Sequence, residues 1–237
     1  MRVAIIGYGK MGKAIEPILV SRGHQVVVKI NSQNPLNVEM LDGIDVAIEI
    51  SRPDLALSHI QICLDAKVPV VVGTTGWYDQ FENIKERVNK ENLSLLYATN
   101  FSIGVHLVFA LNEQLAKWMK NFPQYEPSIE EIHHTAKLDA PSGTGITMAE
   151  GILKHISRKK SWVNRSSQQP EELALTSIRE ENVPGTHSIS YVSDVDTIEL
   201  KHTAHNRSGF ALGAVEAAEW LVGHPGIHSM QEFLNFK

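Results

Sequence analysis

The chain opens with MRVAIIGYGKMG, residues 1–12, and this stretch indicates the fold of the part that follows. Residues 3–6 form a continuous apolar run, which is typical of a strand buried on both faces of a parallel sheet. Glycines at positions 7, 9 and 12 follow directly, and apolar residues then recur at helical spacing. A G-x-G-x-x-G sequence between a strand and a helix predicts a site for the phosphates of a dinucleotide.

Each glycine has a separate physical task in such a turn. Gly7 permits the tight turn, Gly9 lets a pyrophosphate approach the backbone, and Gly12 allows close packing of the helix on the strand. The helix N-terminus adds free N–H groups and the positive end of the helix dipole. The alternative is a tight turn of a flavodoxin-like fold, because the glycine spacing alone is weak evidence.

The first hundred residues repeat this alternation of strand and helix. Apolar runs at residues 26–30, 46–50, 68–72 and 93–97 are separated by segments with helical periodicity. This order predicts an α/β fold with a parallel, Rossmann-type sheet that helices cover on both faces.

After residue 101 the pattern changes and predicts a smaller α+β domain. The expected elements are helices over 105–118, 143–156 and 210–222, a strand over 128–134, a loop-rich segment over 157–185, and a hairpin of strands over 187–193 and 196–204. The hairpin is expected to expose one edge, and the final helix is expected to return to the first part.

Composition excludes several classes of function. The 237 residues include 22 Lys and Arg against 27 Asp and Glu, a formal charge of −5, so the chain has no global basic field for nucleic acid. No apolar stretch approaches the roughly 18 residues of a membrane span. The single cysteine, Cys63, cannot form an internal disulfide or a multi-thiolate metal site. A reducing, cytoplasmic location is therefore expected.

The end of the second strand bears on the choice of cofactor. Asn31 stands where an acidic residue normally binds the ribose 2′-hydroxyl. A carboxylate there would repel a 2′-phosphate, whereas Asn31 does not, and Lys29 is near. We therefore expect NADPH to be accepted at least as well as NADH. The alternative is that both side chains simply face solvent.

Two further segments follow strands at the edge where open α/β sheets bind ligands. They are GTTG at residues 73–76 and ATNF at residues 98–101. Both are small and polar enough to approach a nicotinamide ribose. For residues 73–76 the alternative is an ordinary strand-to-helix loop.

Residues 130–144, EEIHHTAKLDAPSGT, are the most informative stretch. His133 and His134 are neighbours at a strand end, so their side chains point to opposite sides. Ser142 is a predicted N-cap, which leaves the N–H groups of the next two residues open to a carboxylate. With Lys137 nearby, the segment predicts recognition of an acidic small molecule, with His or Lys available for proton transfer. The alternative is a polar surface loop before a capped helix.

Together these motifs resemble the 4-hydroxy-tetrahydrodipicolinate reductase family of bacterial lysine and diaminopimelate synthesis. Residues 131–144 are similar to its E-x-H-H-x-x-K-x-D-A-P-S-G-T signature at every specified position. Residues 73–76 match G-T-T-G, and residues 100–105 match N-F-S-x-G-V. Gly185 and His187 fit G-x-H, and residues 202–214 resemble the family's His…Arg…F-A-x-G-A end, which includes Arg207. The resemblance covers essentially the whole chain in the same order.

The resemblance implies an NADH- or NADPH-dependent reductase that acts on a small anionic dicarboxylate and forms a homotetramer. It implies a dinucleotide-binding domain of residues 1–101 and 208–237. Residues 102–207 would form a substrate-binding and oligomerisation domain, joined to it by hinges that close on substrate. No metal is expected. The exposed hairpin edge would be a natural place for subunits to pair.

The resemblance also implies residue roles. His133 would be the catalytic proton donor and acceptor, Lys137 would donate a proton, and the substrate carboxylates would bind His134, Gly143 and Thr144. The expected cofactor-binding residues are Gly7, Tyr8, Gly9, Lys10, Met11, Gly12, Asn31, Gly73, Thr74, Thr75, Ala98, Thr99, Asn100 and Phe101.

Some positions depart from the family pattern. The glycine turn is one residue shorter than the usual G-x-x-G-x-x-G, Asn31 replaces an acidic residue, and His106 replaces an asparagine.

Three other functions stay open. Another imino-acid dehydrogenase would share the glycine turn without needing the His-His-x-x-Lys run. A metal-dependent hydrolase would use His133, His134, His202 and His205. A non-catalytic NAD(P) sensor would bind cofactor without turnover.

Overall fold

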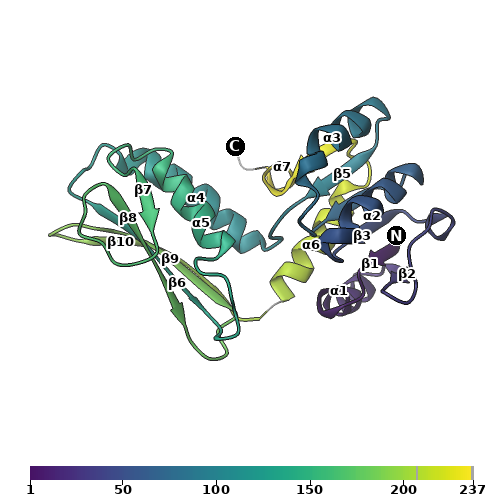
Figure 1. Ribbon diagram of the computed structural model, residues 1–237, viewed down its shortest axis with the longest axis horizontal. Coiled ribbons are helices and arrows are strands. Elements are labelled where there is room, and N and C mark those ends of the chain that lie inside the picture. Colours follow the sequence, from purple (N-terminus) through teal and green to yellow (C-terminus); the bar gives the residue numbers. More distant parts are fainter. Residues whose placement is uncertain (207, 236–237) are drawn as a thin grey trace. The chain divides into compact units, whose positions relative to one another are not determined.

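The computed structural model describes residues 1–206 and 208–235 (Figure 1). The chain forms two compact units. Unit 1 comprises Met1–Ile103 and Ser208–Lys237, and unit 2 comprises Gly104–Arg207. Among the described residues, no helix combines the length and apolar character needed to cross a membrane.

Unit 1 is built on a six-stranded sheet in which every neighbouring pair of strands is parallel. The strand order is β11-β5-β4-β3-β1-β2. Their bounds are β1 (Arg2–Ile6), β2 (Gln25–Ile30), β3 (Val46–Glu49), β4 (Val70–Val72), β5 (Ser94–Tyr97) and β11 (Gly226–Ser229). Because the chain runs outward from β1 on one side to β2 and on the other to β3, the strand order reverses between β1 and β3. Ligands of open α/β sheets bind at such a switch point.

Helices cover both faces of this sheet, as the buried runs require. Alternate residues of β1 point to opposite faces. Val3 and Ile5 pack with residues of α1 (Lys10–Ser21) and α6 (Ser208–Leu221), whereas Ala4 and Ile6 pack with residues of α2 (Pro53–Asp65) and α3 (Phe81–Lys90). The short helix α7 (Met230–Leu234) and two 3₁₀ turns, η1 (Glu39–Leu41) and η2 (Tyr78–Gln80), complete the unit. The Rossmann-type prediction is confirmed, and α6 returns to unit 1 as expected.

Unit 2 is a five-stranded mixed sheet with helices on one face. The strand order is β10-β9-β6-β8-β7. Its elements are α4 (Ile103–Met119), β6 (Glu126–His133), α5 (Gly143–Leu153), β7 (Ser161–Val163), β8 (Glu172–Arg179), β9 (Gly185–Val192) and β10 (Thr197–Ala204). The pairs β10/β9 and β9/β6 are antiparallel, and β6/β8 and β8/β7 are parallel. Residues of α4 and α5 pack on Ile129, Leu175 and Ile189 to form one core. The predicted smaller α+β domain is confirmed, with β10 at a sheet edge.

Two sequence-based expectations are wrong in detail. The segment 157–185, expected to be loop-rich, contains β7 and β8, and alternate residues Leu173 and Leu175 of β8 are fully buried. The chain beyond residue 222 also adds β11, a four-residue strand that extends the sheet beside β5.

The helix predicted over 105–118 is the second. Leu111 and Trp118 recur there at helical spacing with Val105 and Val108, which predicts one buried apolar face, yet they are 54% and 60% exposed. The buried positions after Val108 are Asn112, Ala116 and Met119. The polar side chain of Asn112 hides this stripe from a hydrophobicity pattern, and its amide is buried because it donates to the carbonyl oxygen of Met148 at 2.9 Å.

Candidate functional site

The glycine turn joins β1 to α1 at the switch point of unit 1. Gly7 has φ +103°, and a Cβ there would lie 2.4 Å from the carbonyl oxygen of Ile50. A Cβ on Gly12 would lie 2.6 Å from the carbonyl oxygen of Gly7, so α1 can pack this closely on β1 only with glycine at that position. A Cβ on Gly9 would meet nothing within 4 Å. The three glycines therefore have the separate steric environments that the sequence predicts.

The start of α1 is open to an anion. Its N-cap residue is Gly9, which has no side chain to bond the first-turn N–H groups, and no acidic residue lies in that turn. These N–H groups have no partner within the helix. A helix start of this kind attracts phosphate through hydrogen bonds and the helix dipole. The turn therefore fits the pyrophosphate of a dinucleotide.

Two cavities of unit 1 meet at this turn. The larger, of about 570 Å³, is lined by Gly7, Tyr8, Gly9 and Asn31 of the predicted set. The smaller, of about 340 Å³, is lined by Met11, Gly73, Thr74, Thr75, Thr99, Asn100 and Phe101 of that set. Ile50 and Ser51 line both cavities, so the two adjoin at the end of β3. The remaining predicted residues are Lys10, which is exposed, and Gly12 and Ala98, which are buried.

The polar groups of these walls fit a bound nucleotide. The hydroxyl oxygen of Thr74 is buried and has no hydrogen-bond partner among the described residues. The loop that carries it is held by Trp77, whose indole N–H donates to the Thr74 carbonyl oxygen at 3.0 Å. Trp77 is 1% exposed, so it supports the loop from inside and does not stack on a ligand.

At the end of β2, the side chains of Asn31 and Lys29 already have partners within the protein. The Asn31 side-chain oxygen accepts hydrogen bonds from the backbone N–H groups of Gln33 at 2.9 Å and Asn34 at 3.2 Å, so it caps its own turn. The Lys29 ammonium forms an ion pair with Glu16 and lies 5.1 Å from the centre of the Tyr8 ring. The charge of Lys29 is thus already paired, and Asn31 presents an exposed amide to the larger cavity.

Ile50, Ser51 and His59 are wall residues that sequence reasoning missed. The Ser51 hydroxyl donates to the fully buried carboxylate of Glu49, and Nδ1 of His59 lies 3.2 Å from Oε1 of the same carboxylate. A signal existed, because Ser51 directly follows the predicted strand 46–50 at its carboxyl end, where ligands bind.

In unit 2, β6 and the start of α5 bring the second set of residues together. Along β6 the alternation places Ile129, Glu131 and His133 on the buried face. Ser142 is the N-cap of α5, as predicted, and its hydroxyl oxygen accepts the N–H of Gly145 at 3.0 Å. Gly143, the first residue of α5, is exposed, and a Cβ there would meet nothing within 4 Å. The start of α5 is thus accessible to an anion.

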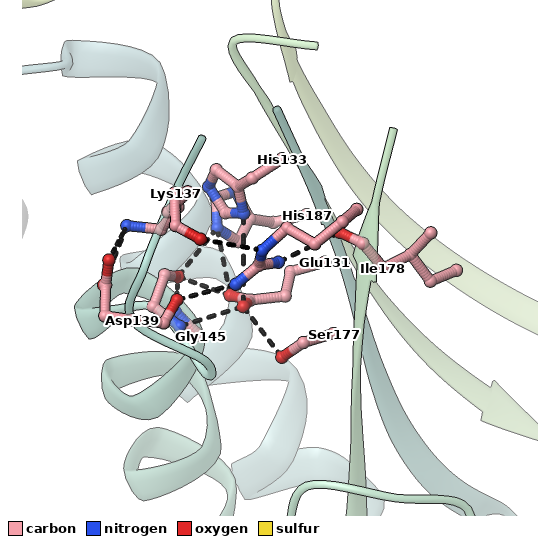
Figure 2. Close-up of polar contacts among 10 residues, drawn as sticks. Glu131, His133, Lys137, Asp139, Gly145, Ser177, Ile178 and His187 are labelled. Atoms are coloured by element: carbon pink, nitrogen blue, oxygen red, sulfur yellow. Dashed lines mark hydrogen bonds and ion pairs between the residues drawn. The ribbon is translucent and has the colours of Figure 1, made fainter. Parts of the chain in front are cut away.

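The buried side chains of this region converge on Glu131 (Figure 2). The rings of His133 and His187 lie 4.9 Å apart at 74°. Nδ1 of His133 is 4.0 Å from Oε1 of Glu131, and Nε2 of His187 is 3.7 Å from Oε2. His187 was noted only as part of a G-x-H resemblance, and Glu131 only as part of the signature. Strand pairing explains the cluster, because β6 and β9 align Glu131 with His187 directly.

Lys137 lies on the loop after β6 and is held by Asp139. Its ammonium donates to both carboxylate oxygens of Asp139 at 2.8 Å, and Figure 2 shows the side chain extended toward that carboxylate. Arg179 fixes the same loop through the carbonyl oxygens of Lys137 at 3.3 Å and Asp139 at 2.6 Å. His134 and Thr144 are half-buried, and each has an interaction of its own. Arg207 lies outside the described residues.

Burial controls the ionisation of the histidines. It lowers the pKa of His133, and the cations Lys137 and Arg179 lower it further, while Glu131 and Asp139 act in the opposite direction. Burial and then the neighbouring His133 lower the pKa of His187 to about 4. The Lys137 hydrogen bond holds the pKa of Asp139 below its usual range. Near neutral pH His187 is therefore uncharged.

Glu131, His133 and His187 form a group whose donor atoms could surround a metal ion, since these atoms lie within 4.8 Å of one another. The hydrogen bonds of Glu131 argue against metal binding by this group. The two oxygens of Glu131 already accept hydrogen bonds from the Ser142 N–H and hydroxyl and from the Ser177 hydroxyl. His134, His202 and His205 of the considered hydrolase site do not belong to this group. The trio is better described as a buried carboxylate, held by hydrogen bonds from Ser142 and Ser177, with two histidine rings beside it.

Family comparisons agree over nearly the whole chain. Residues 1–101 match the family model described as dihydrodipicolinate reductase, N-terminus, and residues 104–234 match the model described as dihydrodipicolinate reductase, C-terminus.

Individual relatives and a solved structure resemble the chain over the same span. It is 45% identical over 236 residues to the 4-hydroxy-tetrahydrodipicolinate reductase of Christiangramia forsetii, which covers 99% of this chain and 98% of that protein. It is 34% identical to the protein of the same name from Alkaliphilus oremlandii, over 96% of this chain and 95% of that protein. Its fold matches the dipicolinate-bound dihydrodipicolinate reductase from Paenisporosarcina sp. TG-14 with a TM-score of 0.82 and 24% identity, over 98% of each chain.

Proposed function

Since the chain belongs to the dihydrodipicolinate reductase family, we propose that it reduces 4-hydroxy-tetrahydrodipicolinate to tetrahydrodipicolinate and that its two units hold different reactants. The enzyme is an oxidoreductase of lysine and diaminopimelate biosynthesis, and unit 1 is its pyridine-nucleotide-binding domain. One observation carries the assignment of the substrate site. The buried His133 and the open N-terminus of α5 both lie beside a single buried carboxylate, Glu131.

Unit 1 binds the cofactor through backbone and small side chains. The N–H groups at the start of α1 hold the pyrophosphate, Gly9 leaves room for its approach, and the Thr74 hydroxyl and residues 99–101 hold the nicotinamide half. When bound, the nicotinamide supplies the hydride.

Unit 2 binds the dicarboxylate and supplies the proton. The N–H groups of Gly143 and Thr144 and the His134 side chain bind the substrate carboxylates, because a helix start favours anions. The substrate loses its 4-hydroxyl group as water, and hydride addition to a conjugated carbon of the dehydrated substrate leaves enamine character that a proton must quench. Lys137 donates that proton, for which it must exchange its hydrogen bonds with Asp139, and His133 acts beside it as a proton donor and acceptor. The intact Lys137 argues against a non-catalytic NAD(P) sensor.

We extend the proposal to cofactor preference, assembly and location. With no carboxylate at position 31, a 2′-phosphate meets no repulsion there, so NADPH is accepted at least as well as NADH. The unpaired edge of β10 is where subunits pair into a homotetramer. The cytoplasmic location stays a prediction.

A coupled assay tests the function. The purified chain is added to the upstream synthase reaction, and oxidation of reduced nicotinamide is followed by absorbance with NADH and NADPH in matched series. We expect turnover with both cofactors. No turnover with either would reject the assignment, and a strong preference for NADH would reject only the cofactor proposal. As a matched variant, Asn31→Asp is expected to lower the affinity for NADPH and leave that for NADH near its original value.

A further inference from the structure

Glu131 is a buried carboxylate to which the reaction as proposed assigns no role. It is 0% exposed and accepts three hydrogen bonds: from the Ser142 N–H at 2.9 Å, from the Ser142 hydroxyl, and from the Ser177 hydroxyl at 2.9 Å. Burial alone would raise its pKa, but the hydrogen bonds from Ser142 and Ser177 hold the pKa of Glu131 below its usual range. The side chain is therefore ionised, and a buried charge is costly unless its partners stay in place.

The first group that Glu131 holds is the start of α5. Ser142 donates to the carboxylate and at the same time caps the helix by accepting the Gly145 N–H at 3.0 Å. A Cβ on Gly145 would lie 2.6 Å from Oε2 of Glu131, so the first turn of the helix rests directly on the carboxylate. The helix end that would receive the substrate carboxylates is thereby tied to β6.

The second group is the histidine pair. His133 is 7% exposed and His187 is 4% exposed. Nε2 of His187 lies 3.3 Å from the Ser142 hydroxyl oxygen, so the same serine links both features. A Cβ on Gly185 would lie 3.2 Å from Nε2 of His133, which shows how closely the backbone of β9 confines that ring. Nδ1 of His133 has no hydrogen-bond partner among the described residues and lies 4.0 Å from Oε1 of Glu131.

Several charges face His133, and Glu131 differs from the others in being fully buried. Lys137 and Asp139 come from the loop after β6 and neutralise each other through their ion pair. Arg179 comes from β8 and adds positive charge. Beyond the neutral His187 of β9, His202 of β10 has its pKa lowered by burial and is uncharged near neutral pH. Asp139 is thus neutralised by Lys137, whereas the negative charge of Glu131 has no such ion pair. Because Glu131 is fully buried, solvent screens its attraction to His133 least.

We propose that Glu131 is a positioning residue of the reductase site: it holds the start of α5 beside His133 and stabilises the protonated imidazole of His133, while His187 stays neutral beside them. This inference rests on the proposed function insofar as His133 is the group that transfers the proton. It explains why one strand carries Glu131 and His133 two residues apart, because that spacing puts both side chains on one face.

Glu131→Gln tests the charge, because it keeps the volume and one hydrogen-bond acceptor. The His133 imidazole is titrated by NMR in the full chain with isotopically labelled histidine, and its signal is assigned by its loss in His133→Asn. We expect the pKa of His133 to fall by roughly one unit, as for the loss of an opposite charge about 4 Å away. The limb of the kcat pH profile that reports His133 should shift by the same amount. Ser177→Ala is the matched control, because it removes one hydrogen bond and keeps the charge, and it should leave both quantities unchanged.

Ser142→Ala tests the anchoring separately. This variant keeps the Glu131 charge and the backbone N–H bond from position 142, and it removes the hydroxyl that joins Glu131 to the Gly145 N–H. Binding of dipicolinate, measured by calorimetry, should therefore weaken about tenfold while the pKa of His133 stays near its original value. If Glu131→Gln does not fold, this variant decides the anchoring, and unchanged dipicolinate binding overturns it.

The outcomes also separate this inference from the proposed function. Wild-type turnover with an unshifted His133 titration and pH profile in Glu131→Gln would overturn the role of Glu131 and leave the reductase assignment intact. A shifted titration in a chain that shows no turnover would support the coupling of Glu131 to His133 and reject the reductase assignment.

Discussion

Single alanine substitutions in the β1–α1 turn should separate cofactor binding from folding. At Gly9 a Cβ would meet nothing within 4 Å, and φ is −89°, which alanine adopts freely. Gly9→Ala should therefore cost only the difference between glycine and alanine at an N-cap, about 0.5–1 kcal/mol. That corresponds to a loss of about 1–4 °C in Tm. The added methyl group would project where the pyrophosphate must approach, so the Kd for the cofactor should rise tenfold or more, or at least about 1.4 kcal/mol.

Substitution of the neighbouring glycines should cause a larger loss of stability. At Gly12 a Cβ would lie 2.6 Å from the Gly7 carbonyl oxygen and 3.1 Å from the Ile5 side chain, so α1 would have to move away from β1. Overpacking of this kind costs about 1–3 kcal/mol. Gly7→Ala adds the strain of φ +103° to a contact of 2.4 Å with backbone, and should destabilise unit 1 at least as much. Both variants should lose stability as well as affinity.

The assay combines two measurements on the full chain. NADH and NADPH fluorescence titrations give Kd, and scanning calorimetry gives Tm. Gly209→Ala is the control, since a Cβ there also meets nothing within 4 Å but lies in the first turn of α6, and it should leave Kd unchanged. Wild-type affinity in Gly9→Ala would refute the approach of the phosphates to this backbone. A wild-type Tm in Gly12→Ala would refute the packing explanation.

The remaining predictions concern unit 2. Lys137→Ala should lower kcat by roughly 10²–10⁴-fold with a much smaller rise in KM, whereas unchanged kcat in steady-state kinetics would remove Lys137 from the chemistry. Because burial and the neighbouring His133 lower the pKa of folded His187 to about 4, against about 6.5 when unfolded, the unfolded chain takes up that proton first as the pH falls. The free energy of unfolding should therefore fall between about pH 6.5 and pH 4, by up to about 3 kcal/mol, and urea titrations should show a smaller fall in His187→Gln; parallel curves would contradict this. Dialysis against a chelator should change neither activity nor Tm, because Glu131 is saturated by hydrogen bonds from Ser142 and Ser177; a loss that zinc restores would show that the trio binds metal.

The features that the sequence predicts well depend on neighbours along the chain. The glycine turn needs only residues 7–12 and the strand before them, and the Ser142 cap needs only the few residues after it. Periodicity likewise identified the five strands of the first hundred residues. Where periodicity was interrupted, prediction failed: β8 is flanked by polar residues, and the buried stripe of α4 contains Asn112.

The cluster around Glu131 could not be predicted because it depends on strand register. Glu131 and His187 are far apart in sequence and meet only because β6 and β9 pair antiparallel with these two residues opposite each other. Ile50 reaches the glycine turn for the same reason, since β1 and β3 are neighbours although β2 lies between them in sequence. A one-residue change of register would turn each of these side chains to the other face.

The return of the chain to unit 1 has a consequence for biosynthesis. The core that lies against β1 includes Ala211, Ala214 and Leu221 of α6, and a Cβ on Gly213 would lie 1.8 Å from the Phe101 carbonyl oxygen. This half of the core is therefore incomplete until α6 has been synthesised, whereas unit 2 is continuous in sequence. Domains that emerge first usually fold first. Here we expect the second unit to mature before the first, so a chain whose synthesis stops before α6 would carry an intact reductase signature and lack a completed site for its coenzyme.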